Sequence, residues 1–419
     1  MINFLKEEIK QRIIEQHKDI FSRGPSENKV PALIAQVLED ITRKERIQLT
    51  EADKNTIITE LVNELIGFGP LEYILKDPEI TEIMVNGPKK IFIEKSGKKQ
   101  LSDVTFESDS QLMNFVQRIL SDTRRRVDET NPYTDFSLRD GSRVNIVISP
   151  VAVDGTAITI RKLAHNIRTV EDLIEKGTID RRVADFLIAC IKAKLNMIFS
   201  GATGAGKTTT LNVLSSYINE NERIITIEDT TELKLNQNHV VRLETKQANI
   251  EGKGRITIRE LFVNCLRMRP DRIILGEIRG VEALDMLQAI CSGHKGSLAI
   301  IHGNSPQDII YRIETMILTS GIPITLETLH RQMAAAINLI IQQEQMRDGS
   351  RKITYITQVN GLKDGKVNLE DIFVFEPEEN LSEGVVRGRW VATGVIPNFY
   401  PIFKKAGINL QQEIFNKGS

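Results

Sequence analysis

Twelve residues decide the fold of this chain, because they join an apolar strand to a glycine-rich loop: Met197-Ile198-Phe199-Ser200-Gly201-Ala202-Thr203-Gly204-Ala205-Gly206-Lys207-Thr208. The last eight have the spacing Gly-x-x-x-x-Gly-Lys-Thr. Glycines let such a loop curl so that successive backbone N–H groups point at phosphate oxygens, and a helix predicted over residues 208–217 adds its positive N-terminal end. The Lys207 amine would reach the β and γ phosphates, and the Thr208 hydroxyl would bind Mg²⁺.

We therefore predict a nucleotide site with ATP and Mg²⁺ as cofactors. The residues expected to hold the nucleotide are Gly201, Ala202, Thr203, Gly204, Ala205, Gly206, Lys207, Thr208 and Thr209. A plain glycine turn is the alternative, and the strand before the loop and the helix after it disfavour that alternative.

Acidic residues follow two further apolar strands. The strand 223–227 leads into Glu228-Asp229, and the strand 272–275 leads through Gly276 to Glu277. The carboxyl ends of parallel strands meet at one edge of a sheet, where ligands bind. We expect Glu277 to orient or deprotonate the attacking water. The acid that usually precedes such a glutamate is absent, so metal binding would rest on Thr208, with Glu228, Asp229 or water completing the shell.

Two histidines flank the next strand, residues 297–301, within the segments Gly293-His294-Lys295-Gly296-Ser297 and Ile301-His302-Gly303-Asn304-Ser305. A buried histidine is usually a satisfied core residue, and two histidines are too few for a zinc site. His302 follows the strand, so we expect it near the γ-phosphate. The same expectation is weaker for His294.

Composition excludes several classes of protein. The 419 residues carry 55 Lys+Arg against 56 Asp+Glu, and a net charge of −1 disfavours binding of nucleic acid through bulk charge. Hydrophobic content of 41% excludes wholesale disorder. Three dispersed cysteines predict neither a disulfide framework nor a zinc knuckle. No membrane span or signal peptide is predicted, so we expect a cytoplasmic protein.

The pattern of the chain changes along its length. Residues 1–70 have helical periodicity, broken at Gly24-Pro25, and residues 71–165 alternate short strands with turns as a mixed α+β domain does. Residues 166–180 are predicted to be a polar linker. Residues 181–419 begin with alternating strands and helices, typical of a parallel α/β sheet, and end in a C-terminal appendage.

The ordered motifs resemble those of the secretion/pilus superfamily ATPases, the hexameric motors of type II and type IV secretion systems and type IV pili. The motifs are the glycine loop, the acidic box Ile227-Glu228-Asp229, the segment Ile274-Leu275-Gly276-Glu277-Ile278-Arg279-Gly280 and the histidine box from Gly293 to Ser305. The connecting segments are similar to the CpaF-like branch that powers Flp/Tad pilus assembly. Those segments are Val85–Pro88, Asp140–Asn145, Arg242–Thr245, Asn249–Gly254 and Leu266–Asp271.

The resemblance implies an architecture and a set of partners. It implies a RecA-like ATPase domain at the C-terminus, a PAS-like mixed domain before it, and nucleotide bound between the two. Arg143 and Arg161 match the arginines that the family's N-terminal domain extends towards the phosphates. The implied assembly is a homohexamer that docks on inner-membrane platform proteins, which gives it a peripheral membrane location. Gly303, Lys295 and Ser292 depart from the residues usual in the histidine box.

The leading hypothesis is therefore an ATP-hydrolysing hexameric motor for Flp/Tad-type pilus assembly or protein secretion. A nucleic-acid translocating ATPase is the alternative, since the RecA-like core also serves helicases. Neutral charge and 5% aromatic residues argue against it and lead us to expect no nucleic-acid partner. The third hypothesis is a non-catalytic scaffold, in which ATP holds a ring together and is not hydrolysed. The presence of Lys207, Thr208 and Glu277 disfavours it.

Overall fold

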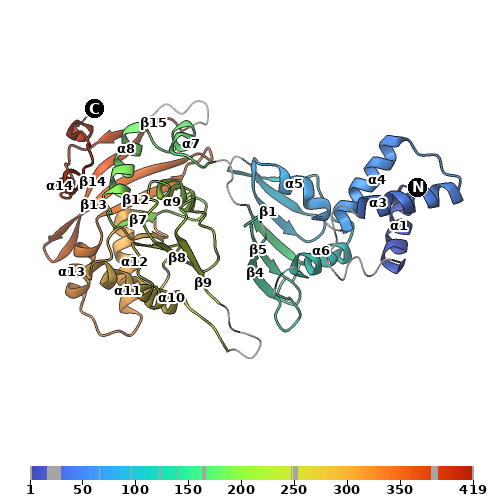
Figure 1. Cartoon of the computed structure of the whole chain (residues 1–419), viewed down its shortest axis with the longest axis horizontal. Coiled ribbons are helices and arrows are strands. Elements are labelled where there is room, and N and C mark those ends of the chain that lie inside the picture. The colour runs from blue at the N-terminus through green and yellow to red at the C-terminus, as the bar shows by residue number, and fades with distance from the viewer. Residues whose placement is uncertain are drawn as a thin grey trace. The chain divides into compact units, whose positions relative to one another are not determined.

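The computed structural model divides the chain into two compact units, drawn in Figure 1. The first comprises Met1–Lys95 and Lys99–Lys162, and the second comprises Leu163–Ser419 with Ser96–Lys98. The structure describes residues 2–16, 30–65, 67–95, 97–121, 123, 125–138, 140–162, 167–246, 248, 253–378 and 386–417. The predicted helix stop at Gly24-Pro25, the start of the predicted linker at residue 166 and residues 249–252 of one connecting segment lie outside these ranges.

In its described residues the first unit begins with the helices α1 (Ile2–Gln16), α3 (Val30–Lys44) and α4 (Glu51–Leu65). Apolar residues recur at helical spacing on each of them, so that one side of each helix is buried in a shared core. That core includes Leu5, Ile9, Ile34, Leu38, Ile41, Ile57 and Leu61. The segment then continues into η1 (Gly69–Leu71) and α5 (Glu72–Lys76).

The rest of the first unit is an antiparallel sheet with a helix against it. Among the described residues its order is β3-β2-β1-β6-β5-β4. The strands are β1 (Ile80–Asn86), β2 (Ile91–Lys95), β3 (Lys98–Leu101), β4 (Tyr133–Ser137), β5 (Arg143–Val147) and β6 (Ala157–Arg161), with α6 (Asp109–Ser121) between β3 and β4. Alternate strand residues such as Ile83, Val144 and Ile160 pack with Phe115 of α6, which leaves the other face of the sheet polar.

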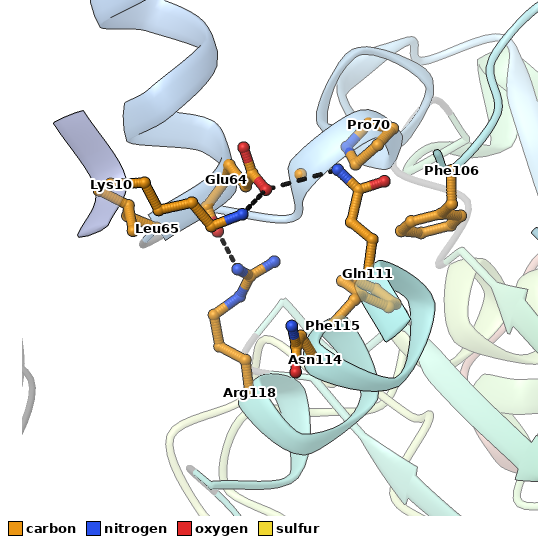
Figure 2. A pocket seen from close by; sticks show the side chains of 10 residues that line it. Lys10, Glu64, Leu65, Pro70, Phe106, Gln111, Asn114, Phe115 and Arg118 are labelled. Atoms are coloured by element: carbon orange, nitrogen blue, oxygen red, sulfur yellow. Dashed lines mark hydrogen bonds and ion pairs between the residues drawn. The ribbon is translucent and has the colours of Figure 1, made fainter. Parts of the chain in front are cut away.

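Glu64 joins the helical segment to α6, as Figure 2 shows. Its carboxylate accepts hydrogen bonds from Lys10 Nζ at 2.5 Å and from Gln111 Nε2 at 3.4 Å, and its carbonyl accepts one from Arg118. The Arg118 guanidinium lies 5.8 Å from the centre of the Phe115 ring, and burial lowers its pKa. A cavity of about 420 Å³ remains here, lined on its apolar side by Leu65, Pro70, Phe106 and Phe115. The helices and the sheet are thus one packed unit.

The second unit is built around one large sheet. In the described part of the chain its strand order is β15-β14-β13-β12-β7-β11-β10-β8-β9. Its strands are β7 (Met197–Ser200), β8 (Ile224–Glu228), β9 (Val240–Glu244), β10 (Arg272–Leu275), β11 (Leu298–Ile301), β12 (Leu339–Gln345), β13 (Arg351–Lys363), β14 (Lys366–Pro377) and β15 (Gly388–Ala392). The strands from β12 to β9 pair in parallel, and β13, β14 and β15 extend the sheet with antiparallel pairs.

Helices cover both faces of this sheet (Figure 1). One face packs against α7 (Val170–Glu175), α8 (Arg181–Lys192), α9 (Lys207–Ser215) and α14 (Tyr400–Lys405), followed by η3 (Gln412–Phe415). The other packs against α10 (Ile258–Cys265) with η2 (Leu266–Met268), α11 (Glu282–Cys291), α12 (Pro306–Leu318) and α13 (Leu326–Ala336). Strand β7 serves both, because Phe199 points into the first layer and Ile198 into the second.

Apolar contacts hold the predicted linker and the predicted C-terminal appendage in place. The segment predicted as a polar linker contains α7, which starts with a capping box between Thr169 and Asp172 and buries Val170 and Leu173 in the core. The C-terminal appendage packs on the core of the second unit, since Phe403 and Phe415 contact Phe186 of α8. Both segments pack because they carry apolar side chains, and burying these side chains lowers the free energy of the folded unit.

No helix among the described residues is both long and apolar enough to cross a membrane.

Candidate functional site

The glycine loop lies where the sequence predicted it, between β7 and α9. Backbone φ is +151° at Gly201, +81° at Gly204 and +95° at Gly206, a region that L side chains rarely adopt. The helix begins at Lys207, so its first N–H groups face the loop. Residues 201–209 thus form a curled loop on a helix N-terminus, which is an arrangement that binds phosphate.

Lys207 and His302 are brought together across the loop. Lys207 is buried, with 6% of the residue exposed, and its amine makes two contacts in the site. It donates a hydrogen bond to the Ala202 carbonyl at 2.7 Å, and it lies 3.5 Å from His302 Nδ1. His302 directly follows β11, and β11 pairs in parallel with β7. The structure therefore places the predicted phosphate-binding lysine and the predicted histidine in one site.

Glu277 continues this cluster on the other side of His302. It follows β10, and its Oε1 lies 3.2 Å from His302 Nε2. Arg279 donates to both carboxylate oxygens, from Nε and Nη2, at 2.7 Å each. Burial by itself would raise the pKa of Glu277, but these contacts outweigh burial and lower the pKa to about 2. Glu277 is therefore ionised at neutral pH.

Arg279 is a site residue that sequence reasoning did not select. Its Nη1 lies 3.5 Å from Asp229 Oδ2, so it links the acid after β8 to the acid after β10. Hydrogen bonding to Glu277 raises its pKa. Its position in the sequence could have indicated this role, because Arg279 lies only two residues after Glu277 in the segment 274–280. A chain of polar contacts then runs through the described site: Asp229, Arg279, Glu277, His302 and Lys207.

Glu228 is placed differently from Asp229. It is 3% exposed, and its Oε2 accepts hydrogen bonds from the N–H groups of Glu232 and Leu233 at 2.8 and 3.0 Å. Burial raises its pKa to about 7. A Cβ built on Gly276 would lie 2.6 Å from Glu228 Cγ. The acid that usually precedes the glutamate is replaced by glycine here because the Glu228 side chain fills that space.

The remaining predicted residues fall into two groups. His294 precedes β11 whereas His302 follows it, so the two histidines lie at opposite ends of the strand. Arg143 and Arg161 lie in the first unit and pair directly across β5 and β6. Both stand on the polar face of that sheet, and Arg161 Nε is 3.7 Å from Glu82 Oε1. Their approach to a nucleotide stays a prediction.

The oxygen donors of the site suit Mg²⁺, which takes few protein oxygens and several from phosphate or water. Thr208 supplies a half-buried hydroxyl in the first turn of α9, and Asp229 supplies a carboxylate at the end of β8. Glu228 Oε1 is a buried oxygen without a hydrogen-bond partner among the described residues. These groups fit a hard cation, and their assignment as ligands stays a prediction.

Comparison with known proteins identifies the family. A model of the Type II/IV secretion system protein family matches residues 64–367, which is more than half of the chain. The chain therefore belongs to this family. The specific branch proposed from the connecting segments is a finer assignment, which this match does not carry.

The matches to individual relatives cover most of the length of each relative. A Mycobacterium tuberculosis protein named, provisionally, for conjugal transfer is 31% identical over 329 residues, covering 77% of this chain and 92% of that protein. Protein VirB11 of Agrobacterium fabrum is 32% identical over 305 residues, covering 65% and 87%. The pilus retraction motor PilT, solved with bound ADP, superposes with a TM-score of 0.51 at 18% identity over 80% of this chain and 85% of PilT. The shared fold confirms the predicted class, a C-terminal α/β domain preceded by a mixed domain.

Proposed function

We propose that this chain is an ATP-hydrolysing motor of a secretion or pilus machine. The observation that carries the proposal is the chain of polar contacts beside the glycine loop, in which His302 lies 3.5 Å from Lys207 Nζ on one side and 3.2 Å from Glu277 Oε1 on the other. A member of the Type II/IV secretion system protein family with this site has the groups that ATP hydrolysis needs. The PilT relative with bound ADP supports the choice of nucleotide.

Each residue has a role in this mechanism. The loop N–H groups and Lys207 bind the phosphates, and the Lys207 amine must turn from the Ala202 carbonyl towards them. Glu277, ionised by its contacts, accepts a hydrogen bond from the attacking water and orients it. Bound Mg²⁺ would neutralise charge on the phosphates. Thr208 and Asp229 would hold it.

The assembly is part of the same proposal. We propose that Arg143 and Arg161 complete the site and neutralise charge that develops on the transferred phosphoryl group. We further propose a homohexamer that docks on inner-membrane platform proteins from the cytoplasm and drives Flp/Tad-type pilus assembly or secretion. The connecting segments quoted above support the Flp/Tad branch.

The test is the Mg²⁺-dependent ATPase rate per subunit, measured across protein concentration. The wild type is compared with Arg143→Ala, Glu277→Gln and Lys207→Ala. We expect the wild-type rate to rise with concentration, as for a ring that must assemble. We expect Glu277→Gln to bind ATP without turnover and Lys207→Ala to lose binding.

Two outcomes would contradict the proposal. Normal hydrolysis by Glu277→Gln would show that another group orients the water. A rate that is independent of concentration and of Arg143 would show that each chain is self-sufficient, which is incompatible with a ring motor. Strong stimulation by DNA or RNA would favour the nucleic-acid translocase instead.

A further inference from the structure

The hairpin of β12 and β13 packs directly against the glycine loop. Strand β12 neighbours β7 in the sheet, so its carboxyl end runs beside residue 201. A Cβ built on Gly201 would lie 2.1 Å from the Gln343 carbonyl oxygen. Since real Cβ atoms do not approach a backbone atom so closely, any side chain at this position would push the loop off the strand. The loop is thus fitted to this hairpin.

The Gln343 side chain fixes the helix that follows the loop. Its Oε1 accepts a hydrogen bond from Thr210 Oγ1 at 2.9 Å, and both residues are buried, with exposures of 2% and 0%. The pairing of β12 with β13 shifts register between Gln342 and Gln343, as a bulge does when it redirects a side chain. The Gln343 amide nitrogen would lie 2.9 Å from a Cβ on Gly206, so the same side chain faces the end of the loop.

Arg351, the first residue of β13, contacts the middle of the loop. Its Nε donates a hydrogen bond to the Gly204 carbonyl at 2.9 Å. Its Cδ would lie 3.2 Å from a Cβ on Gly206. Gln343 and Arg351 therefore hold the loop at its start, its middle and its end, without either residue belonging to a nucleotide-binding motif.

We propose that Gln343 and Arg351 are positioning residues that keep the glycine loop in its phosphate-binding form before nucleotide arrives. The proposal rests on the proposed function, since it assumes that the loop binds nucleotide. A protein whose binding-competent form is only partly populated binds its ligand more weakly by that fraction. Loosening the loop should therefore weaken nucleotide binding and leave the rate of the bound state unchanged.

The experiment measures ADP and ATP binding and the steady-state ATPase of the full chain with Arg351→Gln and with Gln343→Leu. We expect the dissociation constants of ADP and ATP to rise together by about fivefold to tenfold, the effect of losing one hydrogen bond. We expect KM to rise in parallel and kcat to stay within about twofold, because the occupied loop has the same structure.

Two control variants separate positioning from general stability. Arg347→Gln removes an exposed arginine from the turn of the same hairpin. Gln358→Leu removes a glutamine that is 1% exposed on β13 and bonds to Glu370. Gln358→Leu should lower the melting temperature as Gln343→Leu does. Both controls should bind nucleotide as the wild type does.

The results distinguish three failures. If wild type binds no nucleotide, the proposed function fails. If wild type binds nucleotide and the Gln343 and Arg351 variants bind it equally well, the positioning role is wrong. If Arg351→Gln weakens the binding of ATP much more than the binding of ADP, Arg351 contacts the γ-phosphate itself. Its assignment as a positioning residue is then overturned.

Discussion

Glu228 is a buried carboxylate at the end of β8, and Glu277 is a half-buried one after the neighbouring strand β10, yet their pKa values move in opposite directions. Burial acts on both. Glu277 also has Arg279 and His302 as partners, which lower its pKa to about 2. Glu228 has two backbone N–H donors and acidic neighbours, and burial raises its pKa to about 7. Deeper burial without a cationic partner therefore raises the pKa of Glu228, whereas the partners of Glu277 outweigh its burial.

The pKa of Glu228 gives a prediction about stability. Between pH 4.5 and 7 the folded chain holds a proton on Glu228 that the unfolded chain has released, so this group's contribution to stability falls as pH rises. Glu228→Gln keeps an oxygen for the N–H groups of Glu232 and Leu233 and removes the titration. We expect the variant to be more stable than wild type at pH 8, by at most about 3 kcal/mol.

The measurement is thermal or urea unfolding of both proteins from pH 5 to pH 8. The stability difference should shrink as pH falls towards 5, because Glu228 in the wild type is then protonated and neutral. A difference that is constant across this range would show that Glu228 does not titrate there. Activity of the variant is a separate readout, since Glu228 is also a predicted Mg²⁺ ligand.

Arg279 gives a second prediction at this scale. The Arg279 guanidinium lowers the pKa of Glu277, whereas burial raises it. Removing the guanidinium in Arg279→Gln should therefore raise the pKa of Glu277. The carboxylate form orients water, so activity is lost as pH falls through the pKa. We expect the ratio of kcat/KM, variant over wild type, to fall severalfold from pH 8 to pH 5.

The control for this prediction is Arg267→Gln, which changes an exposed arginine in η2. Its ratio to wild type should be flat across the same pH range. A flat ratio for Arg279→Gln would mean that Arg279 does not tune Glu277. The ATP phosphates also titrate in this range, but they are common to every variant and cancel in the ratio.

At the scale of elements, the sequence predicted those that have a strong local signal. Apolar runs followed by glycine or acid predicted β7, β8, β10 and β11 within about one residue of their observed bounds. Because parallel strands end at one edge, this was enough to bring Lys207, Glu277 and His302 together. The candidate site was thus largely predictable from the order of strands and motifs.

The elements that escaped prediction depend on pairing rather than on local pattern. Strands β12, β13 and β14 were not predicted, although Asp364-Gly365 between β13 and β14 is a hairpin signal and both residues have positive φ. The contacts of Gln343 and Arg351 with the loop could not be predicted for the same reason. These contacts require β12 to pair with β7. That pairing joins segments far apart in the chain, and the spacing of residues within either segment does not predict it.

Glycines 276 and 303 show how element packing explains departures from a motif. Glu228 fills the space that a side chain at residue 276 would need. A Cβ on Gly303 would lie 2.5 Å from Ile309 Cδ1 of α12 and 3.2 Å from Ser200 Oγ. A side chain at position 303 would thus require the Ile309 side chain to move. Both glycines keep elements close around the site.

At the scale of the whole molecule, the chain separates binding from the residues proposed to complete catalysis. The glycine loop, Glu277 and His302 all lie in the second unit, whereas Arg143 and Arg161 lie in the first. Each unit has its own hydrophobic core. A motor needs such a division, because movement of one unit can then change the rate of chemistry in the other.

The division predicts the behaviour of a fragment comprising residues 167–419. This fragment contains both core layers of the second unit, together with Gln343, Arg351 and His302, which contact the glycine loop or its helix. We expect it to fold and to bind ADP with the affinity of the full chain. Its ATP turnover should be lower by at least about 100-fold, because arginines that neutralise a transferring phosphoryl group contribute large factors.

Two measurements decide this prediction, ADP titration and ATPase rate, each on the fragment and on the full chain with Arg143→Ala and Arg161→Ala together. If the arginines are the reason, the double variant should match the fragment in both binding and rate. A fragment that turns over as fast as the full chain would place all of catalysis in the second unit. A slow fragment beside an active double variant would mean that the first unit contributes by some route other than these two side chains.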